Sequence, residues 1–324
     1  MWGDPEKKFM IQAAKKAGID KTRLAIVLES EAAYIFCKVL PVEKFENGSN
    51  NIDVFSPGQR YLVLNAEDKT IDTTVLKVNP EGKVNVLRRA SWENCGGAVV
   101  DNAFKQMLID IVGENFMDSF RQNNTADYID IFSAFKMKKR TKMGEYIIHQ
   151  KINLVISPRF LEKYNEDRGT DVSKRTLETR YAKSLKWSGD KMRIDIDLFR
   201  SFFHPANVKL VICIREILSK PEAIGTKVIL MVGGFSECQI VQDAIRKAFP
   251  ECRVVVPHEA GLAVLKGAVL FGHSVISDDD NTPVLEEGDN RLVVALDNNK
   301  VYNTTEDRRS YATTDRLFGR CTIL

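Results

Sequence analysis

The sequence predicts a protein of the α/β class, and two stretches carry that prediction. In residues 227–249 (KVILMVGGFSECQIVQDAIRKAF), a short apolar run meets two glycines, and apolar residues then recur at helical spacing. This order is typical of a buried strand, a tight turn and a helix. In residues 60–90, apolar runs alternate with turn residues, which predicts two or three antiparallel strands. With 324 residues, 44% of them hydrophobic, the chain can bury a large core.

The first quarter of the chain supplies two helices and the start of a sheet. Residues 4–17 have an amphipathic helical pattern, and residues 22–40 predict a strand that turns directly into a second helix. The polar stretch 43–59, rich in Asn, Gly, Ser and Pro, predicts a surface connection. The strands that follow should turn at 65–69 and at 79–82.

The middle of the chain is predominantly helical. Helical spacing is expected in 95–113 and 117–141, and strands are expected at 146–157 and 191–204. A long helix over 207–220 should lead into the strand, turn and helix at 227–249.

The last fifty residues differ in composition. Residues 274–290 are acidic and rich in turn residues, 291–297 could form a lone strand, and 298–324 have little apolar periodicity. We expect the tail, residues 276–324, to be largely disordered.

Charge and cysteine usage exclude several classes of function. The 47 basic residues nearly balance the 44 acidic ones, so the chain has no general electrostatic footprint for nucleic acid. Six cysteines lie far apart without a CxxC pair, and the chain has four histidines, so neither a metal site nor a disulfide framework is expected. No signal-peptide core or membrane-spanning run is present in the sequence, which predicts a cytoplasmic protein.

Several motifs in a fixed order resemble one family. The motifs FMIQAAKKAG, VLESEAA, CGGAVVDNAF, ADYIDIFSAFKMKKRT, MVGGFSE and LKGAVLFG occur in this order along the chain. Together they resemble the 70 kDa heat-shock chaperones and their actin-like relatives over about residues 2–272. The resemblance is greatest to the atypical subfamily of these chaperones that carries the number 12. The resemblance implies the actin-like ATPase fold, with two ribonuclease H-like lobes and ATP between them.

The same resemblance implies a division of the chain. Residues 1–57 would be the remnant of a truncated first lobe, because the sequence starts after that lobe's phosphate hairpin. Residues 58–275 would form the complete second lobe, with a helical and β subdomain at about 98–192. Residues 276–324 would be the tail.

Matches to the family also imply an adenine-nucleotide site. Gly233 and Gly234 match a turn that lies against the adenosine and phosphates, although glycines there could also serve only close packing of strand and helix. Lys139 and Arg140 match a pair that flanks the adenine, which a guanidinium plane can stack upon. A solvated helix face is the alternative for this basic pair.

Three further positions complete the implied site. Gly96 and Gly97 match a glycine pair at the cleft floor. Glu29 occupies the position of a glutamate that arranges magnesium and the attacking water, and it is a candidate relic catalytic residue. Its alternative role is to cap the helix that follows.

The second phosphate loop departs from the family pattern. Asn65 replaces a metal-directing aspartate, while Glu67, Asp68 and Lys69 replace three glycines; Thr70 is retained. Glycines allow backbone N–H groups to reach phosphate oxygens, and two carboxylates there would repel the phosphates. One further difference is Lys136, which stands where a glutamate is usual. Asp72 is retained like Thr70, and we expect it to be structural on the following strand.

These departures favour a non-catalytic function. We expect a nucleotide-sensing or protein-binding member of the chaperone family that binds ATP or ADP weakly, with or without Mg²⁺, and hydrolyses ATP slowly or not at all. The alternative is an active ATP-hydrolysing chaperone. The expected partners are adenine nucleotide and other proteins.

The four C-terminal residues raise one separate possibility. Cys321 begins the sequence CTIL, which fits a prenylation box with terminal Leu. Chance agreement with this permissive pattern is the alternative, and only prenylation would bring the chain to a membrane.

Overall fold

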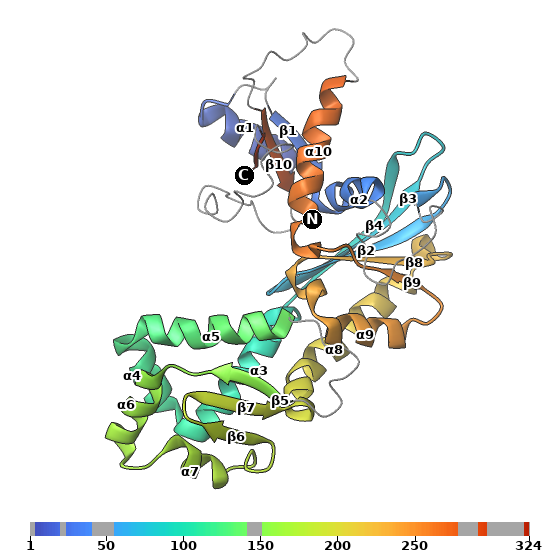
Figure 1. The fold of residues 1–324 in the computed structure, drawn as a ribbon. Coiled ribbons are helices and arrows are strands. Elements are labelled where there is room, and N and C mark those ends of the chain that lie inside the picture. The colour runs from blue at the N-terminus through green and yellow to red at the C-terminus, as the bar shows by residue number, and fades with distance from the viewer. Residues whose placement is uncertain are drawn as a thin grey trace.

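The architecture consists of three groups of elements stacked along the molecule (Figure 1). A five-stranded sheet lies in the middle, a helix-rich group with a small sheet lies at one end, and a group containing both ends of the chain lies at the other. The computed structural model describes residues 4–19, 24–40, 55–140, 151–277, 291–296 and 321–323.

The central sheet has the strand order β4-β3-β2-β8-β9. Its first three strands form the expected antiparallel meander: β2 (Arg60–Ala66), β3 (Thr70–Val78) and β4 (Val84–Glu93). β8 (Val228–Val232) pairs parallel to β2, and β9 (Arg253–Val255) pairs parallel to β8. The two predicted strand-containing stretches therefore meet side by side in one sheet.

Helices cover both faces of this sheet, as continuous apolar strands require. On one face lie α2 (Glu29–Val39) and α10 (Ala263–Ser277). On the other lie α8 (Ile196–Leu218) and α9 (Gln239–Ala248). Side chains of β2 and β8 alternate between the two cores: Tyr61, Val63, Val228, Leu230 and Val232 pack with α2, while Leu62, Leu64, Ile229 and Met231 pack with α8 and α9.

This arrangement is the mixed α/β class that the sequence predicts, and it is consistent with an actin-like ATPase fold. Short 3₁₀ turns lie at η5 (Pro221–Ala223), η6 (Gly234–Glu237) and η7 (Ala260–Leu262).

The helix-rich group lies between β4 and α8 in the chain. Its five helices are α3 (Gly97–Val112), α4 (Glu114–Asn123), α5 (Thr125–Arg140), α6 (Pro158–Arg168) and α7 (Val172–Leu177). Its antiparallel sheet has the order β5-β7-β6, from β5 (Lys151–Val155), β6 (Leu185–Ser188) and β7 (Lys191–Asp195).

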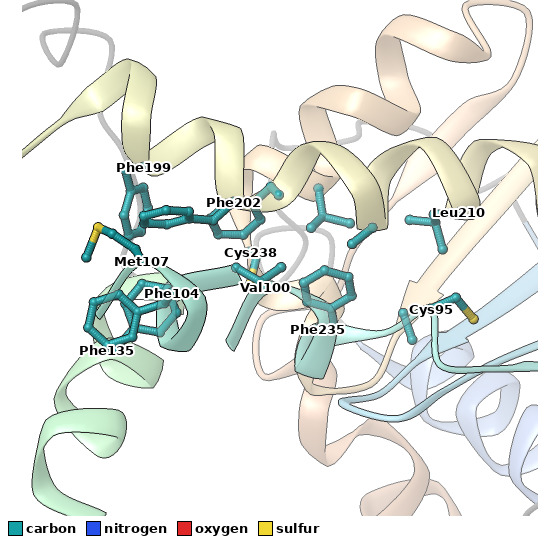
Figure 2. Packing of buried hydrophobic residues seen from close by; sticks show 14 of the residues in the cluster. Cys95, Val100, Phe104, Met107, Phe135, Phe199, Phe202, Leu210, Phe235 and Cys238 are labelled. Carbon is teal, nitrogen blue, oxygen red and sulfur yellow. The ribbon is translucent and has the colours of Figure 1, made fainter. Parts of the chain in front are cut away.

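Aromatic rings tie this group to α8. Phe104 and Phe135 stack with their centroids 4.1 Å apart, and Phe202 of α8 packs edge-on against both rings (Figure 2). Such pairs stabilise a core beyond the apolar area they bury. The core is therefore continuous from α3 and α5 to the central sheet.

The strand predicted at 191–204 is only partly correct. β7 ends at Asp195, and Ile196 already begins α8, which continues through Pro205 to Leu218. The reason is the spacing of Phe199, Phe203 and Leu210, which all lie on the buried side of one helix. The expected start at residue 207 is therefore eleven residues too late.

The third group joins the two ends of the chain. β1 (Leu24–Leu28), β10 (Arg291–Leu296) and β11 (Cys321–Ile323) form a parallel sheet in the order β1-β10-β11. It lies beside α1 (Asp4–Lys16), α2 and α10 (Figure 1).

The strand expected at 291–297 is confirmed as β10, but it is not alone, because β1 offers an open edge with which β10 pairs from Leu292 to Leu296. β11 is a second strand within the tail, which was expected to be largely disordered. The other residues from 278 onward lie outside the described part. Cys321 is the first residue of β11 and pairs in register with Arg291, while Leu324, the last residue of the possible prenylation box, also lies outside it.

Candidate functional site

The altered phosphate loop is a short hairpin between β2 and β3. The backbone N–H of Glu67 donates to the carbonyl of Thr70 at 3.0 Å, and the N–H of Asn94 donates to the carbonyl of Lys69 at 2.9 Å. Thr70 is the buried first residue of β3. The loop therefore accommodates the three side chains of residues 67–69 as an ordinary tight turn between two strands. The hydrogen bond from Asn94 joins this turn to the segment that precedes α3.

This hairpin occupies the N-terminus of α3. The N–H of Gly97 donates to the carbonyl of Glu67 at 3.0 Å, and the N–H of Ala98 donates to the carbonyl of Asp68 at 2.6 Å. The first N–H groups of a helix lack partners within the helix and can bind an anion. Here the protein's own carbonyl groups satisfy two of them.

Gly96 and Gly97 serve this close approach. A Cβ on Gly96 would overlap the carbonyl oxygen of Glu67, and a Cβ on Gly97 would lie 2.6 Å from Oδ1 of Asp68. Both positions must therefore be glycine for the hairpin to pack against α3. The structure brings this pair to the site, but atoms of Glu67 and Asp68 occupy the space next to the two glycines.

Gly233 and Gly234 face the same hairpin from β8. Gly233 has φ +87° and donates its N–H to the carbonyl of Ala260 at 2.9 Å. A Cβ on Gly233 would lie 2.6 Å from Oδ1 of Asn65, and a Cβ on Gly234 would lie 3.0 Å from Nη2 of Arg140. The helix expected directly after the glycines begins only at Gln239, because η6 intervenes.

Lys139 is buried at the centre of the site and is not part of a solvated helix face. Only 1% of its side chain is exposed, and its Nζ lies 2.8 Å from Oδ1 of Asp101 and 3.5 Å from Oδ1 of Asp68. It also donates to the carbonyl of Gly97 at 3.1 Å and lies over the ring of Phe235, 5.8 Å from its centroid. These contacts engage the ammonium group on several sides.

The carboxylate of Asp68 belongs to a small network of charges. Lys136 lies 3.4 Å from Oδ2 of Asp68 and 3.9 Å from Oδ2 of Asp101. Burial alone would raise the pKa of Asp68, but the charges of Lys139 and Lys136 outweigh burial and hold that pKa below its usual range. For Asp101, burial prevails and raises the pKa, although Lys139 opposes it.

Arg140 is the one predicted cofactor-binding cation with an exposed side chain, at 45%. Its guanidinium lies beside Gly234, and Nη1 is 3.9 Å from Oε2 of Glu237. Oε1 of Glu237 in turn accepts from the N–H of Gly261 at 3.0 Å. The 3₁₀ turn after the glycines thereby places a carboxylate beside Arg140.

Glu29 contacts the amide nitrogen of Asn65, whereas the amide oxygen of Asn65 faces Gly233. It is 5% exposed, and its Oε2 accepts from Nδ2 of Asn65 at 2.7 Å. Glu29 does not cap α2: the carboxylate of Glu31 accepts from the N–H of Leu28 at 3.4 Å instead. The alternative role of Glu29 as the cap is therefore wrong, because Leu28 is the N-cap and Glu29 is the first residue of α2. Glu29 instead contacts Asn65, which pairs across the strands with the buried Asp72 of β3.

Three residues of the site were not predicted from the sequence: Asp101, Phe235 and Glu237. Asp101 could have been found, because it follows Gly97 by four residues in a predicted helix and so lies on the same face. Phe235 and Glu237 belong to the motif that supplied Gly234, but their partners come from distant segments. No sequence spacing predicts those contacts.

The residues fit an adenine nucleotide only in part. On the adenosine side, Arg140 and Gly234 offer a guanidinium face beside a residue without a side chain. On the phosphate side, Asp68 presents a negative charge and the amides of α3 are occupied. At the position of the metal-directing aspartate, Asn65 is neutral and donates its Nδ2 to Glu29, so this side chain brings no negative charge for magnesium. Among the described residues, no cluster of three or more His, Cys, Asp or Glu could hold a metal.

Comparison with known proteins gives relatives of one kind. No family model matches the sequence. The chain is 29% identical to heat shock 70 kDa protein 12A of Homo sapiens over 84% of its own length, and equally so to the Mus musculus protein. It is 30% identical to heat shock 70 kDa protein 12B of Homo sapiens over 85% of its length. In each case it spans 47% of the relative, about half of its length. Within the described segments, no helix is long and apolar enough to cross a bilayer.

Proposed function

We propose that this chain, a homologue of heat shock 70 kDa proteins 12A and 12B as its motifs predict, binds adenine nucleotides weakly and does not hydrolyse ATP. It would act as a nucleotide-sensing or protein-binding module that keeps the chaperone-type α/β fold without the chemistry. The names of these relatives state no activity, so the proposal rests on the geometry of the site.

The single observation that carries the proposal is the position of Asp68. Its carboxylate lies within 3.5 Å of Lys139 and Lys136, two cations of α5 on this side of the site. Phosphoryl transfer depends on cations and backbone amides that stabilise charge on the phosphate. Lys136 and Lys139 are paired to carboxylates, and the N–H groups of Gly97 and Ala98 are bonded to the hairpin, so these described groups are not available for this task.

The proposed weak binding rests on the other side of the site. Arg140 is partly exposed and could stack its guanidinium on a purine ring beside Gly234. Such a contact involves the base and not the phosphates. Adenosine, ADP and ATP should therefore bind with similar, low affinity.

A role in binding other proteins agrees with the loss of catalytic groups. A nucleotide bound between Gly234 and Arg140 would contact both the turn after β8 and α5. Its binding could therefore change how the helix-rich group packs against the central sheet. The alternative function is an active, ATP-hydrolysing chaperone. Binding and turnover measurements distinguish it from a protein that binds nucleotide weakly and does not hydrolyse ATP.

The test is a titration combined with a turnover assay on the purified chain. Calorimetry with ATP, ADP and adenosine, each with and without Mg²⁺, should give affinities within about a factor of three of each other. Phosphate release should stay at the level of a blank without protein. Magnesium-dependent ATP binding at least tenfold tighter than adenosine binding, with steady phosphate release, would show an active ATPase.

A further inference from the structure

The three-stranded sheet of the helix-rich group has one buried face and one open face. Along β5, β7 and β6, buried and exposed side chains alternate, and Leu154, Leu185, Met192 and Ile194 lie on the core side. Figure 1 shows the three strands side by side at the end of the molecule away from α10. The residues on the open face are separate from those of the proposed nucleotide site.

The open face carries four positive charges. Lys151 of β5, Lys191 and Arg193 of β7, and Lys186 of β6 all have exposed side chains and lie on this face by the register of the strands. Within the described residues, these four side chains take part in no ion pair or hydrogen bond. We call this group of four the basic face.

Two of these charges face each other unfavourably. Lys186 and Arg193 are directly opposite across β6 and β7, and like charges at opposite positions of an antiparallel pair destabilise a sheet. A carboxylate placed between them would replace this repulsion with charge-assisted hydrogen bonds, and the guanidinium group can bind it through two N–H groups. The arrangement therefore suits a negatively charged ligand.

The spacing of charges along β7 matches an extended acidic peptide. Lys191 and Arg193 are two residues apart, which in a strand corresponds to about 6.6–6.8 Å. In an extended peptide, the side chains of alternate residues point to the same side with the same spacing. Two carboxylates separated by one residue would thus meet Lys191 and Arg193 together.

Three nearby carboxylates favour a small ligand. Asp195 lies opposite Lys151 on the same face, Asp190 lies in the turn between β6 and β7, and Asp197 is exposed in the first turn of α8. A bilayer or a nucleic-acid duplex presents negative charge over a wide area and would meet these carboxylates as well. The whole chain adds little attraction for such polyanions, because its 47 basic residues nearly balance its 44 acidic ones.

We propose that the basic face binds a short, extended segment of a partner protein that carries acidic residues at alternate positions. The segment lies along β7, with its carboxylates beside Lys186, Lys191 and Arg193, and Lys151 attracts a further carboxylate toward β5. Opposite charges provide the attraction, so binding weakens as the salt concentration rises. The interaction does not depend on the proposed nucleotide binding, because the two sites share no residue.

Fluorescence anisotropy with the full chain and a fluorescein-labelled peptide of alternating Glu and Thr tests the proposal. The double variant Lys186→Gln with Arg193→Gln should weaken binding about tenfold, because it removes two contacts to the carboxylates. The control double variant Lys77→Gln with Lys247→Gln removes the same charge from exposed positions of β3 and α9 and should bind as the wild type does. A peptide of alternating Gln and Thr should not bind.

Carbodiimide cross-linking of the wild-type chain locates the peptide without relying on a variant. The Glu side chains should become linked to lysines of the basic face. Equal affinities of the two double variants, equal binding of the two peptides, or cross-links mainly to other lysines would overturn the proposal. Tighter binding to phosphatidylserine vesicles or to single-stranded DNA than to the acidic peptide would also overturn it, in favour of a lipid or nucleic-acid ligand. Unchanged circular dichroism of each variant shows that it is folded.

Discussion

Replacing Lys139 with Met should destabilise the protein by about 3 kcal/mol. Removing one partner of a buried ion pair costs about 3–5 kcal/mol, because the other charge stays buried without compensation. The lower end applies here: Asp101 keeps 15% of its side chain exposed and Asp68 keeps 38%, so water can solvate both carboxylates in part. Methionine preserves the apolar stem against Phe235. A loss of this size corresponds to a melting temperature lower by about 6–12 °C.

The assay is thermal unfolding followed by tryptophan fluorescence, with the exposed neighbour Lys138→Met as the control. The effect should depend on pH. Without Lys139, burial and the charge of Asp68 raise the pKa of Asp101 further. A carboxyl group whose folded pKa is raised stabilises the fold below its unfolded pKa and loses that stabilisation as pH rises through the folded pKa.

The variant should therefore be least stable, relative to wild type, at pH 7–8, and the difference should shrink as pH falls toward 5. In the wild type, the lowered pKa of Asp68 means that its contribution is present above the unfolded pKa and disappears only in acid. A variant as stable as Lys138→Met at every pH would refute the reasoning that the ion pairs hold α5 on the sheet.

Three other changes have defined outcomes. Gly267→Ala should destabilise by about 3 kcal/mol in a melting experiment, since its Cβ would overlap the carbonyl of Ala32 where α10 crosses α2; a melting temperature within 1–2 °C of wild type, roughly the range of a neutral surface change, would contradict this. Val294→Pro should break the ladder between β10 and its neighbours, and hydrogen exchange of β1 should become faster while that of β8 stays unchanged. Arg140→Ala should weaken adenosine binding about tenfold in calorimetry, with Lys138→Ala as the control, and equal affinities would exclude Arg140 from the site.

The fold was predictable where local pattern and tertiary packing agree. The apolar run of β8 followed by two glycines predicts strand and turn, and the strand that enters α2 at Glu29 is predicted correctly. The start of α8 was missed because apolar and charged residues alternate from Met192 to Leu198, a strand pattern that continues past the end of β7. Pro205 also suggests a boundary that packing overrides. The pairing of β10 with β1 joins opposite ends of the chain, and no local pattern contains that information.

The sequence predicted some residues that lie together at the site, but it did not predict Asp101, Phe235 or Glu237, nor which groups the glycines contact. Motif order brought Gly96, Gly97, Gly233 and Gly234 to one place, as the structure shows. What the glycines face depends on the path of the Glu67–Asp68 hairpin, whose carbonyls bond to α3. The sequence predicts two obstructive carboxylates there, but the buried position of Lys139 between Asp68 and Asp101 emerges only from the packing of α5.

The most direct test of the central claim compares ATP and adenosine binding to the wild-type chain and to Asp68→Asn. This substitution keeps the side-chain shape, removes one negative charge and releases Lys136 and Lys139 from one of their carboxylate partners. If Asp68 occupies the place of a phosphate, ATP affinity should rise about tenfold, equivalent to ~1.4 kcal/mol for one charge near the protein surface, while adenosine affinity stays constant. Unchanged ATP affinity in the variant, or wild-type ATP binding already tenfold tighter than adenosine binding, would contradict the account.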